Sequence, residues 1–158
     1  VRIASDNVFI TSQLIDGKFP SYPNVEATET PITISTSRAM LLSALNVAKT
    51  TMENQLVVLS NTQDDDGDDC ILIESRADRL SGSALSLCDI DGGAWNFKVG
   101  VNLKLFHEIV KSIATDNVEI GLSGAKEVIK VRPAGNTSML AMIMPMHILE
   151  MSDDEGLT

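Results

Sequence analysis

The chain has 158 residues, of which 44% are hydrophobic and 22% charged, with a formal net charge of −10. This length suits one ordinary domain, and the sequence has no apolar run of about 18 residues that would span a membrane. Such an acidic surface repels nucleic acid unless the 12 Lys and Arg residues gather on one face. Cys70 and Cys88 have neither disulfide-framework nor zinc-site spacing, so we expect free thiols and a cytoplasmic location.

The first 25 residues stand apart from the rest of the sequence. Residues 1–4 and 8–13 predict a hairpin that turns at Ser5-Asp6-Asn7. Residues 14–25 contain Gly17, Pro20 and Pro23 and predict an ordered, extended connector. Because the chain starts without Met on a strand-like segment, we interpret residues 1–25 as the end of a preceding domain and its connector.

Residues 26–149 contain one pattern twice. In the first copy, a β-prone segment at 32–35 precedes Ser37, whose hydroxyl suits a helix N-cap. The helix predicted over 38–49 has apolar residues at helical spacing, namely Leu41, Ala44, Leu45 and Ala48. The strands predicted to follow cover residues 55–60, 70–75 and 83–90.

The second copy begins with a strand predicted at Trp95–Val99 and an N-cap at Asn102, 65 residues after Ser37. The apolar face of its helix, 103–113, comprises Phe106, Ile109, Val110 and Ile113. Its three predicted strands cover residues 118–122, 127–132 and 139–144. The order β-α-β-β-β, found twice, predicts one α+β domain, followed by a disordered acidic tail at 150–158. A chance likeness between two ordinary α+β stretches is the alternative.

Both predicted helices carry cations on their polar faces. Lys104, His107 and Lys111 form one stripe on the second helix, and Arg38 and Lys49 share a side of the first. Without neighbouring aromatic residues, such cations suit contacts to backbone phosphates and not base readout. Plain solvated helix faces are the alternative, because Glu108 can pair with either lysine.

The segment 138–149 holds four of the seven methionines. Pro145 cannot donate a ladder hydrogen bond, so strand pairing is expected to stop there. Met146, His147 and Ile148 would then run over the surface. Methionine is frequent in grooves that accept different partners, although a core strand with a frayed end is the alternative interpretation.

Catalytic and metal-binding signatures are missing from the sequence. The acidic run Asp64–Asp69 fails as an EF-hand loop, since its first and twelfth positions hold Thr62 and Ile73. A charged hairpin loop is the better interpretation of this run. We expect no catalytic residue, no metal and no cofactor, and keep an acidic metal-dependent enzyme as an alternative.

The connector Leu14-Ile-Asp-Gly-Lys-Phe-Pro-Ser-Tyr-Pro-Asn-Val25 and the ending Met144-Pro-Met-His-Ile148 resemble the bacterial DNA polymerase III beta subunit, the sliding clamp. Val99-Gly-Val-Asn102 also resembles the stretch that opens the second helix of the family's third domain. The resemblance spans residues 1–149. It implies a DNA clamp fold, with the last hairpin of the middle domain at 1–25 and the C-terminal domain at 26–149.

The resemblance implies a non-catalytic processivity factor for DNA replication. Clamps of this family are homodimeric rings whose helices line a hole around double-stranded DNA. The residues that would face DNA, without sequence preference, are Arg38, Lys49, Lys104, His107 and Lys111.

The resemblance also implies an apolar cleft that receives short linear motifs of the DNA polymerase III catalytic subunit, the clamp loader and repair proteins. Its residues here would be Pro20, Val25, Met142, Met144, Pro145, Met146, His147 and Ile148. Asn24 and His147 stand where the family often has arginine, so contacts to acidic peptide groups would be weaker or pH-dependent. A shortened clamp that only docks peptides, without encircling DNA, is the alternative function.

Overall fold

The computed structural model describes residues 2–5, 8–14, 16–17, 28–50, 55–76, 81–137 and 139–148. At the amino terminus, β1 (Arg2–Ser5) and β2 (Val8–Thr11) pair antiparallel, which confirms the predicted hairpin. The Arg2 guanidinium lies 5.1 Å from the centre of the Phe9 ring. The connector positions Pro20, Asn24 and Val25 and the acidic tail lie outside the described residues.

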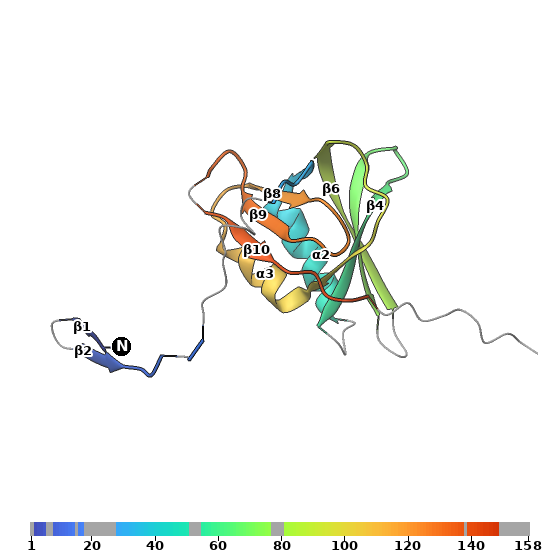
Figure 1. Cartoon of the computed structure of the whole chain (residues 1–158). Coiled ribbons are helices and arrows are strands. Elements are labelled where there is room, and N and C mark those ends of the chain that lie inside the picture. Colours follow the sequence, from blue (N-terminus) through green and yellow to red (C-terminus); the bar gives the residue numbers. More distant parts are fainter. Residues whose placement is uncertain are drawn as a thin grey trace, which may run out of the picture.

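The repeated order of elements is confirmed (Figure 1). The first unit consists of β3 (Ile32–Ser37), α2 (Arg38–Thr50), β4 (Leu56–Gln63), β5 (Asp69–Arg76) and β6 (Ser81–Asp91). The second consists of β7 (Val99–Asn102), α3 (Leu103–Ser112), β8 (Asn117–Leu122), β9 (Ile129–Pro133) and β10 (Ala141–Ile143). Every strand pairing in both units is antiparallel, so the described residues have the α+β class expected.

One eight-stranded sheet joins the two units, in the order β10-β9-β8-β3-β6-β5-β4-β7. The units exchange partners, because β3 pairs with β8 of the second unit and β7 pairs with β4 of the first. Ile34 lies opposite Ile120 across the first seam, and both side chains are buried. Figure 1 shows α2 and α3 between the strands β4 and β6 on one side and β8–β10 on the other.

Local capping sets where each helix begins. The Ser37 hydroxyl accepts the Met40 amide at 3.5 Å, and the Asn102 side chain accepts the Leu105 amide at 3.1 Å. The residues that the two helices bury are Leu41, Ala44, Leu45 and Ala48 in α2 and Leu103, Phe106 and Val110 in α3. Among the described residues, no helix is long and apolar enough to cross a membrane.

Polar contacts tie the two helices together. Arg38, at the start of α2, donates from Nε to the Val110 carbonyl at 3.3 Å and from a terminal nitrogen to the Lys111 carbonyl at 3.2 Å. These carbonyls belong to the last turn of α3, where a helix lacks its own donors. The His107 Nε2 lies 3.1 Å from the Asn46 Oδ1 across the same helix pair.

The strand predicted at Trp95–Val99 is wrong, since β7 begins only at Val99. The chain leaves β6, the neighbour of β5, and must cross to the far side of β4 before it can pair again. Residues 94–98 make this crossing, and the buried Trp95 packs into the core from outside any strand. Glycines at 92 and 93, with φ of 93° and 89°, turn the chain into it.

Strand pairing in the carboxyl-terminal segment stops before Pro145, as predicted, since β10 ends at Ile143. The expectation that Met146 runs unpaired over the surface is wrong. Its amide donates to the Gly100 carbonyl at 2.8 Å and forms an isolated bridge to β7. The bridge forms because β4 pairs with only one edge of β7 and leaves the other edge available. Pro145 has no amide hydrogen to donate, but Met146, the next residue, has one.

Gly100 permits this close approach. A Cβ atom there would lie 2.5 Å from the Met146 carbonyl oxygen and 3.0 Å from the Ile148 Cγ1. We therefore expect Gly100→Ala to lower the free energy of unfolding by about 1–3 kcal/mol, as overpacking does. Urea denaturation measures this change. A Gly17→Ala control meets no atom within 4 Å and should leave stability unchanged; equal stability of the two variants would contradict the prediction.

Arg38→Ala removes two hydrogen bonds from the end of α3 and should cost about 1–2 kcal/mol of unfolding free energy. The matched control is Lys104→Ala, which deletes an exposed cation from the first turn of α3. Urea denaturation of both variants should show a loss for Arg38→Ala alone. The same loss in both would mean that charge, and not capping, is responsible.

Candidate functional site

An open hollow of about 510 Å³ lies between α3 and β10, and we call it the α3–β10 hollow. Its lining residues are Leu105, Glu108, Ile109, Met142, Ile143 and Met144. The hollow contains two of the methionines predicted to line a cleft. Leu105 is 56% and Met144 64% exposed, so the hollow presents apolar side chains to solvent.

Strand alternation explains how β10 serves both the core and the hollow. Ile143 is 5% exposed and belongs to the hydrophobic core, whereas its neighbours Met142 and Met144 are more exposed. The interpretation of the whole segment as a core strand thus holds for Ile143 but not for Met144. Because exposed apolar side chains gain free energy when they are covered, this arrangement favours an apolar ligand.

The remaining predicted cleft residues do not line the hollow. Met146, 38% exposed, and Ile148 lie against Gly100 of β7, and His147 between them is exposed. Pro145 is half-buried at the turn between β10 and the bridge. Pro20 and Val25 lie outside the described residues, so their place in the cleft stays a prediction.

Sequence reasoning missed the contribution of α3 to this hollow. Leu105 stands outside the buried stripe of Phe106 and Val110, on the first turn of the helix. An apolar residue off the buried stripe of an amphipathic helix is a signal that could have identified it. Ile109 was taken only for the core, although it also lines the hollow.

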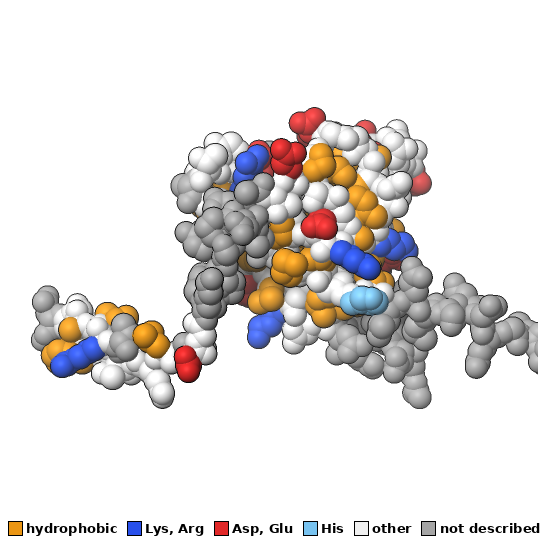
Figure 2. Space-filling view, in the orientation of Figure 1, with side chains coloured by type: hydrophobic (Ala, Val, Ile, Leu, Met, Phe, Trp, Pro, Cys, Tyr) orange, Lys and Arg blue, Asp and Glu red, His pale blue; other side chains and the backbone are white. Residues whose placement is uncertain are grey.

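The five residues predicted to face DNA differ in their surroundings. Lys49, Lys104 and Lys111 are exposed on the two adjacent helices. Arg38 caps α3 and is only half-exposed, and the His107 side chain is 16% exposed, with its Nδ1 3.8 Å from the Glu108 carboxylate. On the face in Figure 2, a few Lys and Arg side chains lie among exposed hydrophobic side chains. The three lysines are therefore the best placed to reach a ligand.

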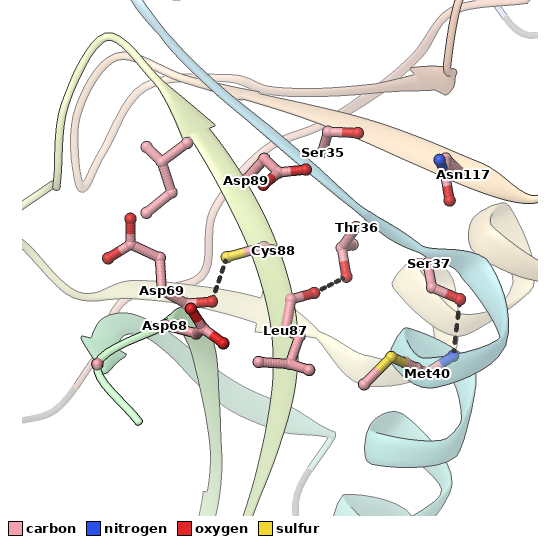
Figure 3. Close-up of a pocket in the computed structure, with 12 residues that line it drawn as sticks. Ser35, Thr36, Ser37, Met40, Asp68, Asp69, Leu87, Cys88, Asp89 and Asn117 are labelled. Atoms are coloured by element: carbon pink, nitrogen blue, oxygen red, sulfur yellow. Dashed lines mark hydrogen bonds between the residues drawn. The ribbon is translucent and has the colours of Figure 1, made fainter. Parts of the chain in front are cut away.

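A second hollow, of about 620 Å³, lies where β3 leaves β6 for α2; we call it the acidic hollow (Figure 3). Asp68, Asp69 and Asp89 line it, together with Met40 and Leu87. Asp68 comes from the charged β4–β5 turn, part of the run that the sequence predicted as a hairpin loop, and Asp69 is the first residue of β5. The Asp64 carboxylate accepts the amides of Asp66 and Asp68 and shapes this turn.

Cys88 lies on the wall of the acidic hollow, where its thiol donates to the Asp69 carbonyl at 3.5 Å. Burial raises its pKa to about 12, and the charges of Cys70, Asp69 and Asp89 act in the same direction. Burial likewise raises the pKa of Cys70. Both thiols thus stay protonated near neutral pH, which makes them poor nucleophiles.

No protein-family model matches the chain. The "Beta sliding clamp" of Salmonella typhimurium is 23% identical over 94% of this chain, and that of Staphylococcus aureus 23% identical over 89%. The chain spans 41% and 37% of the length of these curated relatives.

Solved structures give the same result. A DNA polymerase sliding clamp from Pseudomonas aeruginosa matches with a TM-score of 0.76 and 21% identity, over 93% of this chain and 39% of that one. The DNA polymerase III beta subunit from Thermotoga maritima matches with a TM-score of 0.73 and 16% identity, over the same shares of the two chains. The resemblance to bacterial sliding clamps is thus confirmed, and the chain has the sliding-clamp fold.

Proposed function

We propose that this chain is the carboxyl-terminal part of a DNA sliding clamp, a non-catalytic processivity factor that works in the cytoplasm. The observation that carries the proposal is the α3–β10 hollow, which exposes Leu105, Met142 and Met144 together on a clamp fold. In this role the hollow holds short linear motifs of the replicative polymerase, the clamp loader and repair proteins.

The chemistry of the hollow supports a peptide ligand. Its lining is apolar except for Glu108, and methionines adapt their shape to different side chains. The connector residues Pro20 and Val25 would extend the wall, and Met146 and Ile148 would continue it along β7. His147 stands where clamps often carry arginine, so contacts to acidic motif residues would be weaker.

The adjacent helices support a DNA-facing role. Lys49, Lys104 and Lys111 are few, exposed and separated, which suits weak phosphate contacts that permit sliding. Arg38 and His107 would contribute to the same surface while holding the helices together. Encirclement would require a homodimeric ring of longer subunits, because the chain spans about two fifths of its curated relatives.

The peptide site is tested by truncating its exposed side chains. Met144→Ala and Leu105→Ala should each weaken binding of a polymerase III catalytic-subunit tail peptide about five- to tenfold, because each removes apolar surface from the hollow. Fluorescence anisotropy measures the affinity, and circular dichroism checks the fold. Leu140→Ala, an exposed apolar position outside the hollow lining, is the control. Unchanged affinity in the first two variants would contradict the proposed site.

The DNA surface is tested by charge reversal. Lys104→Glu with Lys111→Glu should weaken duplex binding and reduce the slope of log K against log salt by about two, since two phosphate contacts are lost. The control, Lys98→Glu with Lys126→Glu, makes the same charge change on loops outside α2 and α3. Equal effects in both pairs would mean that net charge alone governs DNA binding.

The alternative, a module that only docks peptides, predicts a different result on circular DNA. Such a chain would bind the tail peptide but would not stay on a nicked circular duplex during gel filtration. A chain that stays on the nicked circle but is released once the circle is linearised would exclude this alternative.

A further inference from the structure

The two hollows share two equivalent lining positions in the repeated units. Ser37 and Asn102 are the N-caps of α2 and α3, so Met40 in the first unit corresponds to Leu105 in the second. In the first unit Ser35 pairs with Asp89. The counterpart of Ser35 in the second unit is Gly100, which pairs with Met146, so Asp89 corresponds to Met146. Counting back along the strand from each pair, Leu87 corresponds to Met144 and Leu85 to Met142.

The burial pattern follows this correspondence. Ser86 and its counterpart Ile143 both point into the protein, with exposed fractions of 0% and 5%. Met40 and Leu87 are 40% and 41% exposed, and their counterparts Leu105 and Met144 are also exposed. The first unit therefore presents apolar side chains to solvent at the same positions as the α3–β10 hollow.

The charge of the two hollows differs. Asp68, Asp69 and Asp89 line the acidic hollow, and there is no Lys, Arg or His among its described lining residues. Among the described residues, the carboxylates that form ion pairs are those of Glu74, Glu108 and Glu119, none of which belongs to this hollow. Figure 3 shows the Asp68 and Asp69 side chains to the left of the β6 strand, Leu87 on the strand itself and Met40 to its right.

We propose that the acidic hollow is a second docking groove, for an extended basic peptide segment of another protein that carries an apolar side chain. The apolar side chain packs on Met40 and Leu87, and flanking lysines or arginines lie against Asp68 and Asp89. Charge complementarity selects this occupant, because three carboxylates without a cation attract cationic side chains and repel acidic ones. The groove is inferred from its own lining residues, and this inference does not depend on the proposed clamp function.

The test uses the full chain and a fluorescein-labelled peptide, Lys-Arg-Leu-Leu-Arg-Lys, with Lys-Arg-Gly-Gly-Arg-Lys as the matched probe without apolar side chains. Asp68→Asn with Asp89→Asn should weaken binding of the leucine peptide about fivefold, since two exposed charge contacts are lost. Met40→Ala with Leu87→Ala should weaken it about tenfold. The control is Asp65→Asn with Asp66→Asn, an equal charge change on exposed turn residues outside the lining.

A control effect below twofold, together with weak binding of the glycine peptide, would support the groove. Equal weakening by the control, or equal binding of both peptides, would overturn it in favour of general charge attraction. Weakening by Leu105→Ala would overturn it in favour of the α3–β10 hollow. Failure of the groove leaves the clamp proposal intact, because that proposal is tested with a different peptide on Met144 and Leu105. If Met40→Ala with Leu87→Ala fails to fold, Asp68→Asn with Asp89→Asn still tests the groove.

Discussion

The exchange of strands between the two repeated units is the constraint on which the rest of the structure depends. Each unit has one helix with a wide apolar face, which only a sheet of sufficient width can cover. Pairing of β3 with β8 and of β7 with β4 joins both units into that sheet. The helices are then held side by side, and their polar faces, with Lys49, Lys104 and Lys111, become one surface.

The same arrangement determines where the α3–β10 hollow lies. β7 must present a residue without a side chain at Gly100, because the Met146 backbone approaches it there. This bridge holds the segment after Pro145 against the sheet, so Met144 faces Leu105 of α3 across the hollow instead of fraying away. A small residue on one strand thus supports a site whose apolar side chains come from two other elements.

Charged residues are distributed unevenly over the surface of this acidic chain. Lys49, Lys104 and Lys111 are exposed on the helices, whereas Arg38 and His107 also bind across the helix pair. Asp68, Asp69 and Asp89 line the acidic hollow, whereas Glu108 is the one carboxylate among the described lining residues of the α3–β10 hollow. The two hollows therefore differ in the charge that they present to a peptide.

The sequence by itself determined the order of elements, the N-caps at Ser37 and Asn102, the buried helix faces and the end of pairing before Pro145. These features depend on periodicity and on single-residue chemistry, which are local. It also identified Met142 and Met144 for the site. Only the tertiary structure decided that residues 94–98 cross the sheet, that Gly100 receives Met146, that Arg38 caps α3 and that Leu105 completes the hollow. Each of these depends on which distant segments meet, and local spacing carries no information about that choice.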